Sequence, residues 1–84
     1  MPIKENMDIV IKTLAKAQKD AMGDAWVEAT QLQKDTGISP EDLNNAVELL
    51  ERDGLVKWRQ VLETATFKFF QASITIKGRL SIER

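Results

Sequence analysis

The segment from Thr30 to Val56 constrains the fold most, because its start and stop signals leave room for only two short helices before a strand begins. Ser39-Pro40-Glu41-Asp42 combines a hydroxyl cap, a proline suited to the first helical position, and acids favoured by the helix dipole. Gly37 and Gly54 are suited to end helices, since glycine adopts the left-handed conformation easily. We therefore predict one helix capped by Thr30 and ending at Gly37, and a longer helix from the proline to about residue 52.

Apolar periodicity predicts the elements on either side of this segment. Apolar side chains between Ile3 and Ala21 recur near the helical period, and Met22-Gly23-Asp24 interrupts the pattern. After residue 54 the sequence becomes rich in β-branched and aromatic residues with partial alternation. We predict a first helix over residues 3–21, a very short strand at 26–28, a hairpin with strands at 55–62 and 67–74, and a terminal helical turn capped by Thr75 and weakened by Gly78.

The composition is that of one ordinary globular domain, and it excludes several classes of chemistry. The 84 residues are 43% hydrophobic and 30% charged, and they include neither Cys nor His. A disulfide, a Cys/His zinc site and a Ser-His nucleophile pair are excluded, so we predict a non-enzyme without metal or cofactor. The start lacks a secretion-signal pattern and no apolar run could span a bilayer, which predicts a cytoplasmic location and no membrane partner.

The net charge of −1 hides two regions of opposite charge. From Ser39 to Asp53, five acidic residues face one basic residue, whereas from Leu55 to Arg84 six basic residues face two acidic ones. Any polyanion is therefore expected at the C-terminal third of the chain. The acids of the first region also have a purely structural explanation, since Glu48 precedes Arg52 by four residues, the favourable order for a helix ion pair.

Three segments of the sequence resemble parts of a known family. They are Thr36-Gly37-Ile38-Ser39 between the two short helices, residues 49–56 at the end of the second, and residues 74–79 at the step from strand to helix. With helix, short strand, helix, turn, helix and hairpin in this order, the chain resembles the winged helix-turn-helix domain of bacterial and archaeal DNA-binding regulators. The resemblance covers nearly the whole chain. It implies a single α+β domain over residues 1–84, with three helices, a short strand, a two-stranded β-hairpin wing and a short C-terminal helical turn.

The resemblance also implies DNA binding, with the third helix in the major groove and the wing against phosphates or the minor groove. The candidate base contacts are Ser39, Asn44 and Asn45, because an asparagine amide can pair with adenine. The candidate phosphate contacts are the basic residues of the wing and of the segment after it, namely Lys57, Arg59, Lys68, Lys77 and Arg79. Charged residues also protect exposed strand edges from aggregation, so both interpretations of the wing cations stay open.

Four aromatic residues crowd the predicted hairpin: Trp58, Phe67, Phe69 and Phe70. If exposed, they indicate a homodimer or partner interface, and if buried, they close the core. Two functions follow. The first is a small transcriptional regulator or accessory factor that binds double-stranded DNA. The alternative is a protein-interaction module that uses the acidic third helix or the aromatic hairpin without DNA.

Overall fold

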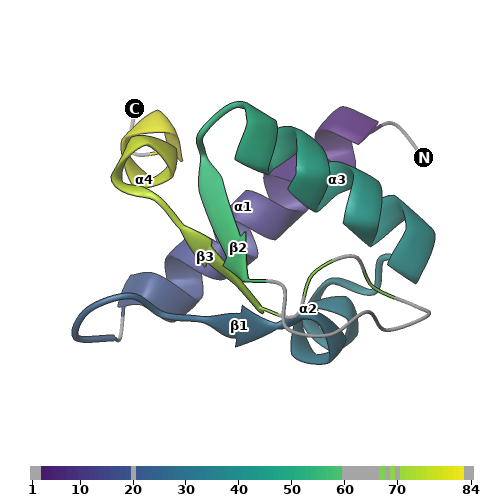
Figure 1. The fold of residues 1–84 in the computed structure, drawn as a ribbon, viewed down its shortest axis with the longest axis horizontal. Helices are drawn as coiled ribbons and strands as arrows, with labels where there is room; N and C mark the ends of the chain where they lie inside the picture. The colour runs from purple at the N-terminus through teal and green to yellow at the C-terminus, as the bar shows by residue number, and fades with distance from the viewer. Residues whose placement is uncertain (1–2, 20, 60–66, 68, 70, 83–84) are drawn as a thin grey trace.

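The computed structural model describes residues 3–19, 21–59, 67, 69 and 71–82. Its elements have the predicted order along the chain (Figure 1). They are α1 (Ile3–Lys19), β1 (Val27–Glu28), α2 (Ala29–Thr36), α3 (Pro40–Arg52), β2 (Val56–Arg59), β3 (Gln71–Ile74) and α4 (Ile76–Ile82).

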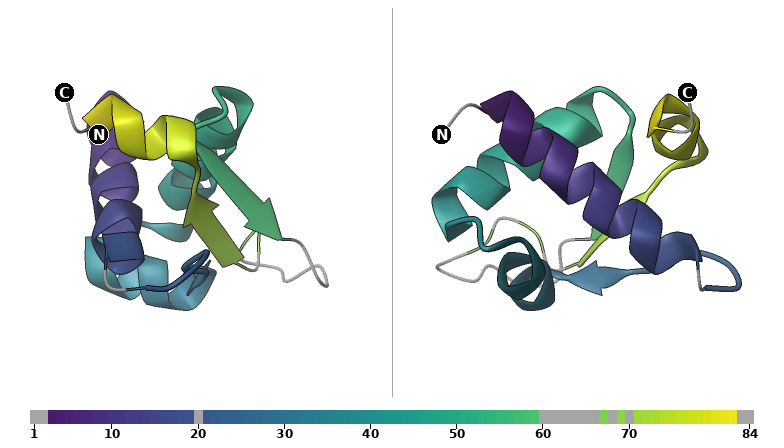
Figure 2. Two further views of the ribbon diagram at one scale, coloured as in Figure 1. Left: turned by 90° about the vertical axis from the view of Figure 1, so that its left-hand side faces the viewer. Right: turned by 180° about the vertical axis from the view of Figure 1, so that it is seen from behind.

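The three strands form an antiparallel sheet in the order β1-β3-β2. Ala72 lies at its centre, opposite Val27 of one neighbouring strand and Trp58 of the other. α1 crosses one face of this sheet and packs along α3, as the front and back views show (Figure 1; Figure 2). α1 therefore covers that face of the sheet. α4 begins directly after the end of β3.

The core lies between α1, α3 and the sheet. Its side chains come from the apolar stripe of each long helix and from the inner face of the strands. They include Val10, Ile11 and Leu14 of α1, Leu32 of α2, Leu43, Val47 and Leu50 of α3, and Val56, Ala72 and Ile74 of the sheet. The helical period in the sequence therefore selects the core side of α1 and α3 correctly.

Three of the predicted helix ends are confirmed. Ser39 caps α3, because its Oγ accepts a hydrogen bond from the backbone N–H of Asp42 at 3.4 Å. Gly37 ends α2 in the left-handed conformation, with a φ of 70°. Thr75 caps α4, because its Oγ1 accepts from the backbone N–H of Gly78 at 3.0 Å.

Other predicted boundaries are wrong. α2 begins before Thr30, so the capping position falls on Glu28, whose side chain makes no capping hydrogen bond. α1 ends earlier than predicted, the first hairpin strand begins at Val56 instead of Leu55, and the second spans Gln71–Ile74. Phe67 and Phe69 precede β3 and belong to no strand. The predicted connection between the strands, residues 63–66, lies outside the described residues, as do residues 60–62 of the predicted first strand.

Gly78, which is predicted to weaken the terminal helix, also allows α4 to approach the sheet. A Cβ at this residue would overlap the carbonyl oxygen of Leu55 and would lie 2.8 Å from Cγ1 of Ile74. The Leu55 carbonyl is held in place, since it accepts a hydrogen bond from the backbone N–H of Thr75 at 3.1 Å. Thr75 Oγ1 also donates to the carbonyl of Gly54 at 2.7 Å. α4 is therefore fixed by backbone contacts to the residues just before β2.

Candidate nucleic-acid interface

The beginning of α3 carries the three candidate base contacts, and the structure separates them. Ser39 is exposed, with its Oγ engaged as the helix cap, and Asn45 is exposed on the outer side of the helix. Asn44 is only 8% exposed, so the predicted base contact there does not fit the structure. The sequence holds a signal for this burial, because Asn44 lies three residues before the core residue Val47 and hence beside the apolar stripe.

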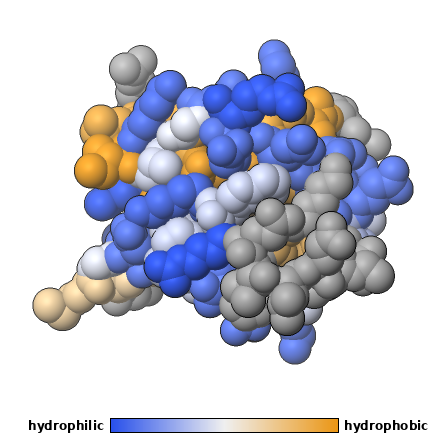
Figure 3. Space-filling view, viewed as in Figure 1, coloured by the Kyte–Doolittle hydropathy of each residue, from blue (hydrophilic) through white to orange (hydrophobic). Residues whose placement is uncertain are grey.

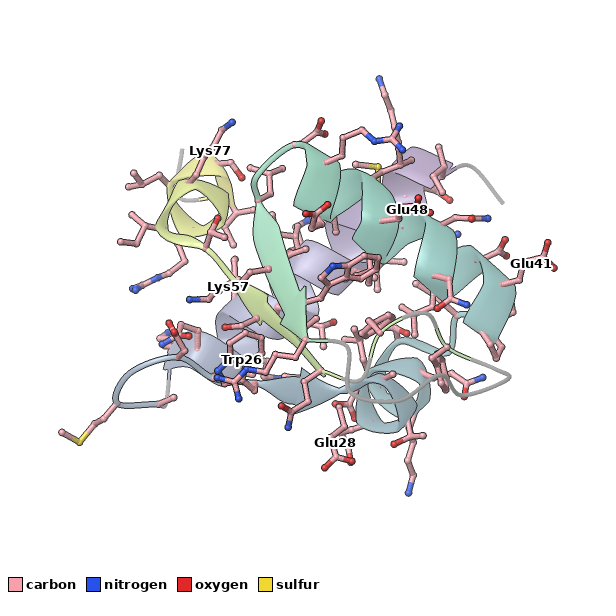
Figure 4. All side chains as sticks on the ribbon, in the orientation of Figure 1. Trp26, Glu28, Glu41, Glu48, Lys57 and Lys77 are labelled. Atoms are coloured by element: carbon pink, nitrogen blue, oxygen red, sulfur yellow. The ribbon has the colours of Figure 1, made fainter. Side chains whose placement is uncertain are left out.

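The outer side of α3 is negative. Glu41 and Glu51 are exposed, and Figure 4 shows Glu41 and Glu48 projecting from the helix. Glu48 forms the predicted ion pair with Arg52, at 3.8 Å between Oε1 and Nη2. Carboxylates on this surface oppose the attraction of phosphate that supplies much of the affinity for DNA. The resemblance implies that α3 lies in the major groove, and the outer carboxylates of this helix oppose a close approach to a duplex.

The cations of β2 face away from the core, because Lys57 and Arg59 alternate with core-facing residues along the strand. Lys57 Nζ lies 2.7 Å from Oδ2 of Asp24 in an exposed ion pair. The guanidinium carbon of Arg59 lies 4.0 Å from the centroid of the Trp26 ring, a cation–π contact. Neither partner is evident from the sequence, since β1 and β2 both pair with β3 and this pairing brings the chain before β1 close to β2.

The cations of α4 differ in their contacts. Lys77 Nζ donates to the carbonyl oxygen of Asp53 at 2.9 Å, close to the end of α3. Arg79 is exposed, and among the described residues its side chain has no hydrogen-bond or ion-pair partner. Lys68, the remaining candidate phosphate contact, lies outside the described residues.

Two adjoining hollows bring the cations of three elements together. One, of about 610 Å³, is lined by Lys57, Lys77 and Arg79, with Gln18 and Asp24 among its other walls. The second, of about 570 Å³, is lined by Lys16, Lys19 and Arg79 over the apolar side chains of Ala15 and Ile82. We call these five cations the basic surface: Lys16, Lys19, Lys57, Lys77 and Arg79.

The basic surface and the acidic helix occupy different parts of the molecule. In Figure 4, Lys57 and Lys77 lie on the side of α4, whereas Glu41 and Glu48 lie along α3 toward the opposite side. Among the described residues that line the two hollows, the single acid is Asp24, which lies in the first. The charge division of the sequence thus becomes a division in space, and α1 adds Lys16 and Lys19 to the positive side.

The hairpin aromatics mainly close the core. Phe69 is 2% exposed, and its ring centroid lies 6.0 Å from that of Trp58 and 6.1 Å from that of Phe67. Trp58 and Phe67 are half-buried and pack against the core. Phe70 lies outside the described residues. An aromatic docking patch is therefore not supported by the three rings that are described, and the large exposed aliphatic side chains of this end of the chain lie on α4.

The described residues lack two further features, a metal site and a membrane-spanning helix. In the ranges that the structure describes, no group of acidic side chains is arranged to hold a metal ion. Over the same ranges, the helices are too short or too polar to cross a membrane.

A solved structure with a similar arrangement is that of NMB1585, a MarR family regulator from Neisseria meningitidis. The two structures superpose with a TM-score of 0.66 over 89% of this chain, at 16% sequence identity. The chain has the winged helix-turn-helix fold. This winged helix spans 46% of the length of that regulator. No protein-family model matches the sequence, and a comparison with curated proteins also finds no match.

Proposed function

We propose that this winged helix is a small regulator or accessory factor that binds duplex DNA, with the phosphates held by the basic surface. The observation that carries the proposal is the gathering of five cations from α1, β2 and α4 around two adjoining hollows. The likeness in fold to a MarR family regulator supports a regulator of this kind. DNA is the polyanion that such a role requires, and lysine and arginine bind it by releasing counterions.

The cations of the basic surface are available at little cost. The side chains of Lys16, Lys19 and Arg79 have no hydrogen-bond or ion-pair partner within the described ranges. Lys57 must leave Asp24, but an exposed ion pair contributes only about 0.2 to 1 kcal/mol. Lys77 can keep its bond to the Asp53 carbonyl, because an ammonium group has two further N–H donors. A duplex can therefore recruit these side chains without disturbing the fold.

α3 has a smaller part in this proposal than the resemblance implied. Ser39 and Asn45 remain proposed base contacts at the N-terminal end of the helix, whereas its outer carboxylates keep the rest of α3 away from phosphates. Binding that depends mainly on phosphates carries little sequence information. We therefore expect modest sequence specificity and a strong dependence of affinity on salt.

The test measures binding to a fluorescently labelled duplex of mixed sequence by anisotropy over a series of salt concentrations. The variant Lys19→Glu/Arg79→Glu should weaken binding and reduce the log-log salt slope by about 0.9 for each lost contact. The control is Lys4→Glu/Lys34→Glu, which makes the same charge change at exposed positions that do not line either hollow of the basic surface. Absence of binding by the unmodified protein at low salt would refute the proposal, as would an equal loss in both variants.

A second candidate function is a protein-interaction module that uses α3 without DNA. It is favoured by the exposed Glu41 and Glu51 of α3 and by the burial of Asn44, a predicted base contact on the same helix. Under this alternative, Glu41→Lys/Glu51→Lys should abolish capture of a basic partner protein and leave duplex binding undetectable, as in the unmodified protein. If α3 instead lies near a bound duplex, the same variant should bind DNA more tightly.

A further inference from the structure

α4 exposes an aliphatic stripe that the fold does not use. Ile76 is 76% exposed and Leu80 is 57% exposed. They are four residues apart, so they lie on the same side of the helix. Figure 3 shows hydrophobic atoms gathered on the surface at the place that α4 occupies in Figure 1. Two large aliphatic side chains on a helix of seven residues are therefore presented to the outside.

Cations border this stripe on both sides. At about 100° per residue around the helix axis, Lys77 lies on one side of the stripe and Arg79 on the other. Gly78 and Ile82 lie on the opposite, inner side of the helix. This placement agrees with the structure, in which Gly78 is buried against the Leu55 carbonyl and both cations are exposed. Figure 2 shows α4 from its outer side in the left-hand view, lying across the top of the molecule.

The inner side of α4 is sufficient to hold the helix. Gly78 packs against Leu55, and Thr75 caps the helix and donates to the Gly54 carbonyl. The outer stripe makes no contribution of this kind, because its side chains point away from these contacts. Ile76 and Leu80 are not among the described residues that form or pack against the core, and exposed aliphatic side chains next to cations make α4 a candidate docking surface.

The charges decide between the possible occupants. A second copy packed α4 against α4 about a two-fold axis would bring Lys77 and Arg79 of both copies together, and like charges oppose that contact. Phosphates satisfy the cations but gain nothing from Ile76 and Leu80. An acidic helix with its own apolar stripe satisfies both, since its leucine-type side chains cover the aliphatic pair and its carboxylates reach the flanking cations.

The neighbouring hollow extends this surface. Lys16, Lys19 and Arg79 surround the apolar side chains of Ala15 and Ile82 beside α4. A helix laid along the outer stripe therefore meets Ile76 and Leu80 in the middle and Lys77 at one edge, and at the other edge it meets Arg79, which shares its hollow with Lys16 and Lys19. We propose that the outer side of α4 docks an acidic amphipathic helix of a partner protein. The partner shares Arg79 and Lys77 with the proposed DNA site, so it competes with DNA wherever that site is used.

The test selects partners from a displayed library of random helical peptides on the immobilised full chain, with counter-selection on Ile76→Ser/Leu80→Ser. The expected peptides are acidic, with apolar residues spaced three or four positions apart. A labelled copy of a selected peptide should then bind at least about tenfold more weakly to Ile76→Ser/Leu80→Ser, and to Arg79→Glu, than to the unmodified chain, by fluorescence anisotropy. The matched control is Ile9→Ser, an exposed isoleucine of α1 that lines neither hollow, which should bind normally.

Several results would overturn the proposal. They are the selection of basic or neutral peptides, equal binding to the serine variant and to the unmodified chain, or no enrichment at all. Binding to phosphatidylserine vesicles that requires Ile76 and Leu80, without a selected peptide, would assign the surface to a membrane. A dimer in sedimentation velocity that disappears in the serine variant would assign it to a second copy. Circular dichroism of each variant shows whether the fold is kept.

The two proposals fail separately. Leu80→Ser shortens the stripe at a residue that lines neither hollow of the basic surface, and it keeps every cation, so its affinity for duplex DNA should equal that of the unmodified chain. Lys57→Glu changes a cation of β2 that does not flank the stripe on α4, and it should weaken DNA binding more than peptide binding. If DNA does not bind at all, the peptide selection still tests the docking surface by itself.

Discussion

α3 and α4 are both capped helices close to β2, yet α3 contributes mainly to stability, whereas α4 presents side chains that are available for binding. α3 buries a full apolar stripe, and its polar side chains mostly serve the helix itself, as the Ser39 cap and the Glu48–Arg52 pair show. α4 is held by backbone contacts at Gly78 and by Ile82 against the core, and its other large aliphatic side chains, Ile76 and Leu80, face outward. The helix that the fold assigns to DNA is thus the more structural of the two. A winged-helix fold does not by itself decide which helix binds, so function has to be argued from the side chains.

The largest expected effect removes the contact that places α4. Gly78→Ala puts a methyl group into the Leu55 carbonyl oxygen, and the hydrogen bond from Thr75 keeps that oxygen from moving aside. Overpacking of this kind costs about 1 to 3 kcal/mol and occasionally more, and we expect the upper end because the opposing atom belongs to the backbone. Urea unfolding followed by circular dichroism measures the loss of free energy of unfolding.

The control for this change is Arg79→Ala in the same helix. It shortens an exposed side chain and adds no atom against the sheet, so its free energy of unfolding should stay close to that of the unmodified chain. An alanine at 78 that is as stable as the control would show that α4 can move away from Leu55 freely. In that case backbone contacts would not fix α4, and its contrast with α3, which is held by buried apolar side chains, would not stand.

The sequence predicted the fold because its signals are local. The Ser39-Pro40 start, Gly37 in the left-handed conformation and the apolar period of α1 and α3 each depend on a few neighbouring residues. Thr30 failed as a cap for the same reason: the strand before it runs directly into the helix, and the start is set by tertiary pairing of β1 with β3.

The site could be predicted only in its residue types. The division between an acidic α3 and a basic C-terminal third was visible, but the partners of Lys57 and Arg59 were not, because Asp24 and Trp26 are distant in sequence. The role of Gly78 was also hidden, since close approach to Leu55 depends on where β3 directs the chain. Local sequence patterns therefore identify the candidate binding residues, whereas the pairing of the strands determines which of them lie together.

A smaller effect separates structure from recognition at the start of α3. Ser39→Ala removes the cap of the Asp42 N–H and should cost about 1 kcal/mol of stability. If Ser39 serves only as a cap, duplex affinity should stay unchanged at a temperature where both proteins are folded. A loss of affinity with unchanged salt slope would instead place α3 against the bases. Ser39→Asp is the rescue variant for stability, since aspartate also caps helices well.

Releasing a cation of the basic surface should have a weaker effect of opposite sign on binding. Asp24→Asn removes the partner of Lys57, which should cost at most about 1 kcal/mol of stability because the pair is exposed. The freed ammonium group and the lost negative charge should tighten duplex binding a few-fold at low salt, as measured by anisotropy. Glu5→Gln, at an exposed acid in the first turn of α1, makes the same charge change at a residue that lines neither hollow of the basic surface. If both variants tighten binding equally, net charge and not Lys57 is responsible.

The smallest expected effects come from a matched pair of arginines, one on each helix. Arg52→Gln breaks the ion pair with Glu48 and should cost about 0.2 to 0.5 kcal/mol of stability, whereas Arg79→Gln has no ion pair to lose among the described residues. The effect on DNA binding should be larger for Arg79→Gln than for Arg52→Gln. Arg79→Gln should lower the log-log salt slope by about 0.9, and Arg52→Gln should leave it unchanged. If Arg52 carries the slope instead, α3 lies against the phosphates despite its carboxylates, and the assignment of binding to the α4 side is wrong.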